Sequence, residues 1–142
     1  MTSLDFVGIA NGVLPGEVDW LLWLAAMIDC IGVIAVTRRW GPTGWTYSPM
    51  IDVRSPHLAL LQRAQLIAGV GRVYTSRGGT NTRPHRWEVH AAEANAVLAQ
   101  VRPYLVAQAM RADAALELWQ LETTYHQDTF PAAVAAHLAA LY

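Results

Sequence analysis

A single carboxylate interrupts a long apolar run near the start of the chain. Asp29 lies within WLLWLAAMIDCIGVIAV, which extends from Trp20 to Val36. A carboxylate in such a place could bind a metal or transfer a proton, but both roles need further polar groups at close spacing. The neighbouring thiol of Cys30 has no basic residue beside it in sequence that would activate it. We therefore expect hydrogen-bond donors to satisfy Asp29, because an unpaired buried charge is costly.

Arginine gathers in one part of the sequence. Between Val33 and Trp87 lie eight arginines and one acid, Asp52, which give this window a charge of +7, whereas the whole chain carries −1. Clustered guanidinium groups are typical of surfaces that bind nucleic-acid phosphates and base edges, although scattered arginine is also ordinary on a solvated sheet. The eight are Arg38, Arg39, Arg54, Arg63, Arg72, Arg77, Arg83 and Arg86.

The hydrophobic pattern predicts a helix that gives way to a strand at Gly32. Leu, Ala, Met and Trp dominate up to Cys30, whereas β-branched residues follow from Val33 onward. A helix and a strand explain this run better than a membrane-spanning helix, in which a central Asp would cost about 2.5–3.5 kcal/mol. We therefore expect no membrane partner.

Two hairpins organise the middle of the chain. Alternating apolar residues predict strands at 32–39 and 47–54 around a turn-rich connection, and a second pair at 71–77 and 85–90. Because a helical segment separates the two pairs, we expect an α+β domain of order αββαββα. Its four strands would form one antiparallel sheet with the helices on one face.

Helix signals fill the remaining segments. In SPHLALLQRAQLIAG, Ser55 is expected to be the N-cap, Pro56 the first helical residue and Gly69 the C-terminal stop. Pro103 is expected to interrupt the helical segments that follow. These are predicted at about 91–101, 104–122 and 130–142.

Alternation along the strands separates an inner face from an outer one. If Ile34 and Val36 face the helices, Thr37 and Arg39 face outward. The same parity turns outward Ser48, Met50, Asp52, Arg54, Arg72, Tyr74, Ser76, Arg86 and Glu88. With the hairpin arginines added, the candidate DNA-binding residues are Thr37, Arg38, Arg39, Ser48, Arg54, Arg72, Tyr74, Ser76, Arg77, Arg83 and Arg86.

Length and composition fit one folded domain. The chain has 142 residues, and 54% of them are hydrophobic. We therefore expect a single domain over 1–142, with a core at about 17–118 and a C-terminal helical extension at about 119–142. One cysteine argues against a disulfide framework, and Asp5 and Glu17 are atypical of a signal peptide, so we expect a cytoplasmic, nucleoid-associated protein. Ten arginines, 23 alanines and no lysine indicate a GC-rich bacterial or phage genome.

The stretch LAAMIDCIG, from Leu24 to Gly32, resembles the nonapeptide that names the LAGLIDADG homing endonucleases. Further along, GVGRVY at 69–74 and RPYL at 102–105 resemble segments that flank the later helices of that family, and the order αββαββα is its half-domain. The residues of the nonapeptide that match directly are Leu24, Ala25, Ile28, Asp29 and Gly32.

The resemblance implies a homodimer in which the two motif helices pack against each other. Each sheet would then lie along a major groove of duplex DNA at a pseudo-palindromic site. The small residues Ala26 and Cys30 would allow the helices to approach closely, although packing within one chain could also explain them. The expected interface residues are Ala25, Ala26, Asp29 and Cys30, and the implied role of Asp29 is structural.

The sequence departs from the family where the resemblance implies catalysis. The metal-binding acid two residues after the first Asp of the motif is Ile31 here, which offers no oxygen to Mg²⁺. The family's lysine after Pro-Tyr-Leu is Gln108, and a basic residue at the start of the second helix corresponds loosely to His57. We therefore predict no catalytic residue, no metal site and no cofactor, with Mg²⁺ needed only by a nuclease.

Three functions remain in competition. The first is a sequence-specific DNA-binding protein of this fold that does not cut, acting in transcription regulation. The second is a Mg²⁺-dependent homing endonuclease that uses a substitute ligand or lost its acid by engineering. The third is an RNA-binding, maturase-like protein or a protein-interaction module. Ile31 and Gln108 favour the first.

Overall fold

Helices and strands alternate along the part of the chain that the computed structural model describes, residues 18–125 apart from 43, 78, 80 and 81. The elements are α1 (Val18–Ile31), β1 (Gly32–Gly41), β2 (Gly44–Ser55), α2 (Leu58–Ala68), β3 (Arg72–Thr75), β4 (His85–His90), α3 (Ala91–Val101), the 3₁₀ turn η3 (Arg102–Tyr104) and α4 (Ala109–Tyr125). The predicted order is confirmed over this range, and the helix predicted at 130–142 lies outside it.

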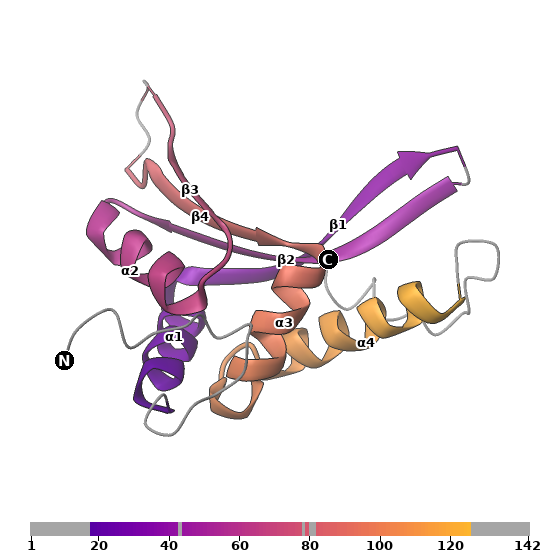
Figure 1. The fold of residues 1–142 in the computed structure, drawn as a ribbon. Helices are drawn as coiled ribbons and strands as arrows, with labels where there is room; N and C mark the ends of the chain where they lie inside the picture. The colour runs from indigo at the N-terminus through magenta and orange to yellow at the C-terminus, as the bar shows by residue number, and fades with distance from the viewer. Residues whose placement is uncertain (1–17, 43, 78, 80–81, 126–142) are drawn as a thin grey trace.

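The four strands form one antiparallel sheet in the order β1-β2-β4-β3. In Figure 1 the helices lie together on one side of this sheet, and the β1–β2 and β3–β4 hairpins rise at opposite ends of the other side. The predicted α+β class, with helices on one face of a four-stranded antiparallel sheet, is confirmed. None of the described helices combines the length and the apolar character that crossing a membrane requires.

The core lies between the sheet and the helices. Ile34, Ile51 and Val53 are fully buried, as the strand alternation predicted, and Val36 is 5% exposed. Because alternation turns every second side chain of a strand to the same side, the intervening residues lie on the helix-free face. Other fully buried side chains in the same core include Leu21, Leu24, Ile28, Trp87, Val89 and Leu98.

Gly71 allows the chain to pass tightly over Trp87. The residue has a φ of +93°, and a Cβ at this position would lie 2.4 Å from the Trp87 indole nitrogen. That nitrogen donates a hydrogen bond to the carbonyl of Val70 over 3.1 Å. The GVG of the sequence therefore serves close packing over the sheet, which only glycine allows.

The start of α2 differs from the prediction. Ser55 ends β2 rather than capping the helix, and its hydroxyl accepts a hydrogen bond from the main-chain N–H of His57 over 3.0 Å. The N-cap is His57, which makes no side-chain capping bond. The prediction of Ser55 as N-cap was wrong, because a serine hydroxyl can accept from an N–H group in the turn before a helix as well as from the first N–H groups of the helix itself. Gly69 was predicted correctly and ends α2 with a φ of 72°.

Candidate nucleic-acid interface

Charged side chains form cross-strand rows on the helix-free face of the sheet. Arg54 of β2 lies opposite Arg86 of β4. In the next row Asp52 of β2 lies opposite Glu88 of β4, which in turn lies opposite Arg72 of β3. Acids and arginines therefore alternate on this face, and those directly opposite each other on neighbouring strands are close enough to interact.

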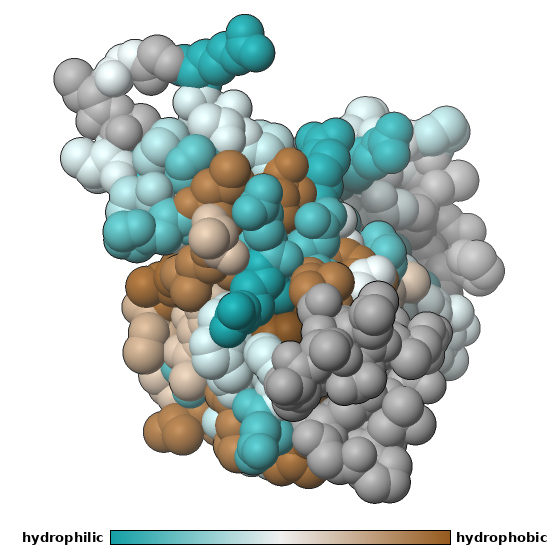
Figure 2. Space-filling model, turned by 60° about the vertical axis from the view of Figure 1, so that its left-hand side comes forward, coloured by the Kyte–Doolittle hydropathy of each residue, from teal (hydrophilic) through white to brown (hydrophobic). Residues whose placement is uncertain are grey.

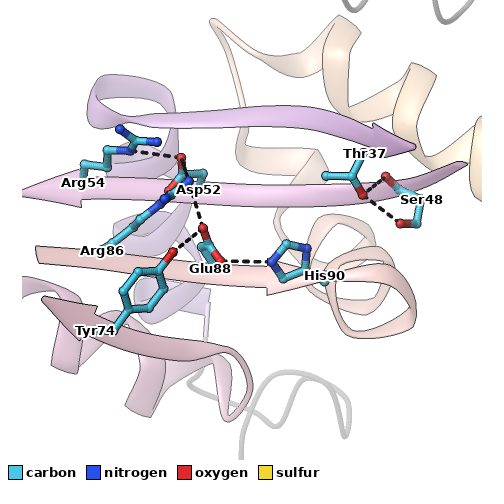
Figure 3. A network of polar contacts seen from close by, with 8 residues as sticks. All are labelled: Thr37, Ser48, Asp52, Arg54, Tyr74, Arg86, Glu88 and His90. Atoms are coloured by element: carbon cyan, nitrogen blue, oxygen red, sulfur yellow. Dashed lines mark hydrogen bonds and ion pairs between the residues drawn. The ribbon is translucent and has the colours of Figure 1, made fainter. Parts of the chain in front are cut away.

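Hydrogen bonds and ion pairs join the outward side chains of β2, β3 and β4 into a polar network, which consists of Asp52, Arg54, Tyr74, Arg86, Glu88 and His90 (Figure 3). Arg86 is at its centre. Its guanidinium forks onto Asp52, with Nε donating to Oδ1 over 2.9 Å and Nη2 donating to Oδ2 over 3.1 Å. Nη2 also lies 2.8 Å from Glu88 Oε1. The hydrogen bonds to Asp52 raise the pKa of Arg86. A guanidinium forked onto one carboxylate and bonded to a second is held in one orientation.

Glu88 joins β3 to the polar network. Its Oε1 accepts a hydrogen bond from the Tyr74 hydroxyl over 2.5 Å, and its Oε2 lies 3.1 Å from His90 Nε2. Burial alone would raise the pKa of Glu88, but hydrogen bonds from Tyr74 and His90 and the charge of Arg86 outweigh burial and lower this pKa. Burial and the hydrogen bond to Glu88 raise the pKa of Tyr74. At neutral pH, Glu88 is thus an anion that accepts bonds from a neutral Tyr74.

Arg54 and Arg72 border the polar network and are more exposed than Arg86. Nε of Arg54 donates to Asp52 Oδ2 over 3.2 Å, while 46% of its side-chain surface is exposed. The guanidinium carbon of Arg72 lies 5.1 Å from the ring centre of Tyr74, within cation–π range. Among the described residues, the Nη1 and Nη2 groups of both arginines have no hydrogen-bonding partner. Both side chains can therefore donate to a ligand.

The β1–β2 hairpin carries the other polar candidates. Thr37 Oγ1 and Ser48 Oγ lie 3.0 Å apart across the two strands. Arg39 is exposed, and no acidic side chain of the described region pairs with it. Arg38 lies on the other side of β1, where its guanidinium carbon is 4.5 Å from the ring centre of Trp45. The structure thus keeps Arg38 apart from the outer face that Thr37 and Arg39 share.

Three further candidates lie between β3 and β4. Ser76, Arg77 and Arg83 are exposed, and the main-chain N–H of Ser76 donates to the carbonyl of Pro84 over 2.8 Å. These residues extend the basic surface beyond the end of the sheet.

Sequence reasoning underestimated the acids on this face. The charge window that ends at Trp87 contains Asp52 but stops one residue before Glu88. Strand alternation already turned Glu88 outward, but only the register of β4 between β2 and β3 places it against Arg72, Arg86 and Tyr74. The outer face is therefore less positive than the window suggested, and its centre is an ordered arrangement of opposite charges.

Asp29 is held where α1 meets the start of α4. Its Oδ2 accepts a hydrogen bond from the main-chain N–H of Val106 over 2.8 Å, and its Oδ1 accepts one from the N–H of Gln108 over 3.0 Å. These residues immediately precede Ala109, where α4 begins and where a helix leaves N–H groups unpaired. The expectation that hydrogen-bond donors satisfy Asp29 is confirmed.

The side chain of Gln108 completes this junction. Its Nε2 donates to the carbonyls of Ile28 and Gly32, both over 2.7 Å, and its Oε1 accepts from the N–H of Ile34 over 2.9 Å. Both N–H groups of the amide are therefore bound to the main chain where α1 gives way to β1. The side chain keeps no free donor for a phosphate.

Solved structures share this arrangement of helices and sheet. The homing endonuclease I-CvuI in complex with its target matches with a TM-score of 0.74 and 17% identity, over 88% of this chain and 81% of that chain. The intron-encoded homing endonuclease I-CeuI complexed with DNA matches with a TM-score of 0.62 and 15% identity, over 74% of this chain and 56% of that one. The chain has the LAGLIDADG homing endonuclease fold.

A third match bears the name of the motif. The LAGLIDADG meganuclease I-AabMI bound to uncleaved DNA has a TM-score of 0.68 and 15% identity, over 86% of this chain and 44% of that one. No protein-family model matches the sequence, and no curated protein matches it. The three-dimensional arrangement of helices and strands, rather than similarity of sequence, therefore establishes the LAGLIDADG fold.

Within the LAGLIDADG fold, α1 is the motif helix and Ile31 is its last residue. The Ile31 side chain is half-buried and packs against the core. The resemblance implies a metal-binding acid here, but Ile31 offers no oxygen ligand. Among the described residues no group of three His, Cys, Asp or Glu side chains could hold a metal ion. Ile31 therefore does not fit the place of the metal-binding acid that the resemblance implies, and His57 is an exposed N-cap.

One side of the motif helix is apolar and exposed. Figure 2 is turned toward the side on which α1 lies in Figure 1, and it shows hydrophobic residues reaching the surface in the lower half of the molecule. Of the predicted interface residues, Ala25 is fully buried within the chain and Asp29 is bonded to the α4 junction, whereas Ala26 and Cys30 are exposed. The exposed residues at four-residue spacing are Val18, Leu22, Ala26 and Cys30.

Proposed function

We propose that this chain is a sequence-specific double-stranded DNA-binding protein that does not cut its target. The observation that carries the proposal is the helix-free face of the sheet, on which ordered arginines of three strands lie beside exposed arginines of both hairpins. Guanidinium groups on such a surface can contact phosphates and base edges. The fold supports this proposal, because I-CvuI is in complex with its target, I-CeuI is complexed with DNA and I-AabMI is bound to uncleaved DNA.

Two residues argue against cleavage. Ile31 places a hydrocarbon side chain where an oxygen ligand would be required, so divalent metal would lack its anchor. Gln108 holds the main chain with both N–H groups of its amide, so it cannot donate to a phosphate as a lysine would. We therefore assign the chain the role of a DNA-binding regulator, located with the nucleoid in the cytoplasm.

We further assign the exposed stripe of α1 to a homodimer. Val18, Leu22, Ala26 and Cys30 present an apolar surface that a second copy of the same helix would cover in a two-fold contact. Val18 and Leu22 are 42% and 45% exposed, and exposed apolar side chains that adjoin one another are typical of protein interaction surfaces. A dimer of this kind would read a pseudo-palindromic site with one sheet in each half-site.

Selection of bound duplexes from a random DNA library tests the proposed function. The wild-type protein should enrich a pseudo-palindromic site, bind it with an affinity that falls steeply with salt, and leave it intact in the presence of Mg²⁺. Cleavage of the selected site that EDTA abolishes would favour the nuclease instead. Preference for structured RNA over the selected duplex would favour a maturase-like function.

The Ile31→Asp variant supplies the companion experiment. If the chain is a nuclease that has lost only its metal ligand, this variant should nick or cleave the selected site with Mg²⁺. Intact DNA with retained binding would show that the rest of the site, Gln108 included, no longer supports cleavage. The variant leaves the Gln108 hydrogen bonds in place, so the outcome does not depend on disturbing the α1–α4 junction.

A further inference from the structure

Asp52 has its oxygens occupied by arginines. Oδ1 accepts from Nε of Arg86, and Oδ2 accepts from Nη2 of Arg86 and from Nε of Arg54. The Asp52 side chain is only 10% exposed, so it is poorly placed to meet a ligand itself. Asp52 therefore acts on a ligand through the two arginines that it orients and through its charge, rather than by direct contact.

The two arginines differ in what they leave free. Arg86 is 26% exposed and uses Nε and Nη2 on Asp52 and Glu88. Arg54 is 46% exposed and uses only Nε, so its Nη1 and Nη2 groups remain without a partner in the described part of the chain. A pair of parallel N–H donors is the group that reads guanine, because it can bond to O6 and N7 at once.

We propose that Arg54 reads a guanine in each half-site and that Asp52 is the positioning residue that fixes its guanidinium for this contact. The proposal rests on the function assigned above. A guanidinium tied at Nε has lost part of its rotational freedom before DNA binds, so less entropy is lost on contact. The negative charge of Asp52 also disfavours a nearby phosphate, which directs Arg54 toward a base edge.

The rest of the polar network keeps Asp52 itself in place. Arg86 forks onto Asp52 and also bonds to Glu88, and Glu88 is bonded in turn to Tyr74 (Figure 3). Three strands therefore contribute to the position of a single carboxylate. Arg54 therefore differs from Arg39 in having an acidic partner that orients it. Arg39 is exposed on β1 without an acidic partner among the described side chains, and it suits a phosphate contact.

Base preference distinguishes these roles. The site selected with wild-type protein is varied one base pair at a time, and dissociation constants are measured for the wild type and for Arg54→Ala, Asp52→Asn and Arg39→Ala. Position 54 is changed to alanine because a lysine can itself bond to guanine O6 and N7. Arg54→Ala and Asp52→Asn should both lose discrimination for guanine at the same symmetric position, by roughly 5- to 150-fold. Arg39→Ala should weaken binding by the same factor whichever base pair is varied.

Two further readouts separate positioning from general damage. Asp52→Asn should bind non-specific duplex more tightly than the wild type, because the face loses a negative charge. In the double variant, Asp52→Asn should add little to the loss already caused by Arg54→Ala at that position. Arg54 is exposed, so Arg54→Ala decides the base-reading role even if Asp52→Asn fails to fold.

Different failures have different meanings. If the wild type binds no duplex DNA, the proposed function falls and this assignment falls with it. If the wild type binds a defined site but Arg54→Ala retains the same preference at every position, only the assignment of Arg54 is overturned. If Arg54→Ala loses a guanine that a folded Asp52→Asn still reads fully, Asp52 is not its positioning residue.

Discussion

The main-chain N–H of Gln108 lies 3.0 Å from Asp29 Oδ1, and the side chain of the same glutamine binds the carbonyls of Ile28 and Gly32 on either side of the helix end. One residue therefore binds the motif helix through both its main chain and its side chain. These hydrogen bonds join α1, β1 and the start of α4. All their donors are uncharged N–H groups, and the only charged acceptor among them is the Asp29 carboxylate. The position that the family resemblance assigns to a lysine is thus used here to stabilise the fold.

Replacing Gln108 by lysine should destabilise the protein. A lysine ammonium could still donate to the carbonyls of Ile28 and Gly32, but it cannot accept from the N–H of Ile34. Leaving a buried N–H unsatisfied costs about 1–3 kcal/mol. Urea denaturation should therefore show a free energy of unfolding lower by about 2 kcal/mol for Gln108→Lys.

Gln120→Lys is the matched control, because Gln120 is exposed on α4. A change on such a surface is usually within about 0.5 kcal/mol. Equal stabilities for the two lysine variants would show that the side-chain bonds of Gln108 contribute little.

Asp29→Asn should loosen the start of α4. Val106 and Gln108 donate to different oxygens of the carboxylate, and an asparagine replaces one of these oxygens by an NH2 group, so one of the two N–H groups would face a donor. The loss of the charged acceptor should lower the free energy of unfolding by about 1–3 kcal/mol. Hydrogen exchange should show faster exchange at the amides of Val106 and Gln108 than in the wild type. Unchanged protection at both amides would contradict the structural role of Asp29.

Much of the fold could be predicted because it depends on local pattern. The parity of Ile34, Val36, Ile51 and Val53 follows from the two-residue period of a strand, and the structure buries all of them. The stop at Gly69 also follows from local chemistry, because glycine adopts the left-handed conformation without strain.

The polar site could be predicted only in part, because its contacts join distant segments. Residue types suggested arginines on an outer face, but no local signal shows that Glu88 meets Tyr74 and Arg86 across two strand pairs. Gln108 and Ile34 are likewise 74 positions apart in sequence. A glutamine in a helical segment is usually solvated, so its bonds to the end of α1 could not be inferred from spacing.

The contribution of Glu88 to stability should depend on pH. Its pKa in the folded protein lies below the usual value near 4.5, so the carboxylate stabilises the fold above that value and loses its effect as pH falls through the folded-state pKa. Glu88→Gln should therefore be less stable than the wild type at pH 7, and the difference should shrink as the pH is lowered below about 4.5. Thermal unfolding of both proteins across this range is the measurement. A difference that stays constant down to pH 3 would mean that Glu88 acts through packing alone.

Ala26→Arg should separate the proposed dimer. Ala26 is exposed in the middle of the apolar stripe of α1, and in a two-fold contact each copy would place its new arginine near the same helix of its partner. Juxtaposed like charges cost on the order of several kcal/mol, so sedimentation should show a monomer at concentrations where the wild type is a dimer. Ala59→Arg on the exposed side of α2 is the control, because it adds the same charge to a helix outside the stripe. If Ala26→Arg and Ala59→Arg sediment alike as dimers, the motif helix is not the contact, and DNA binding by two subunits must rest on another surface.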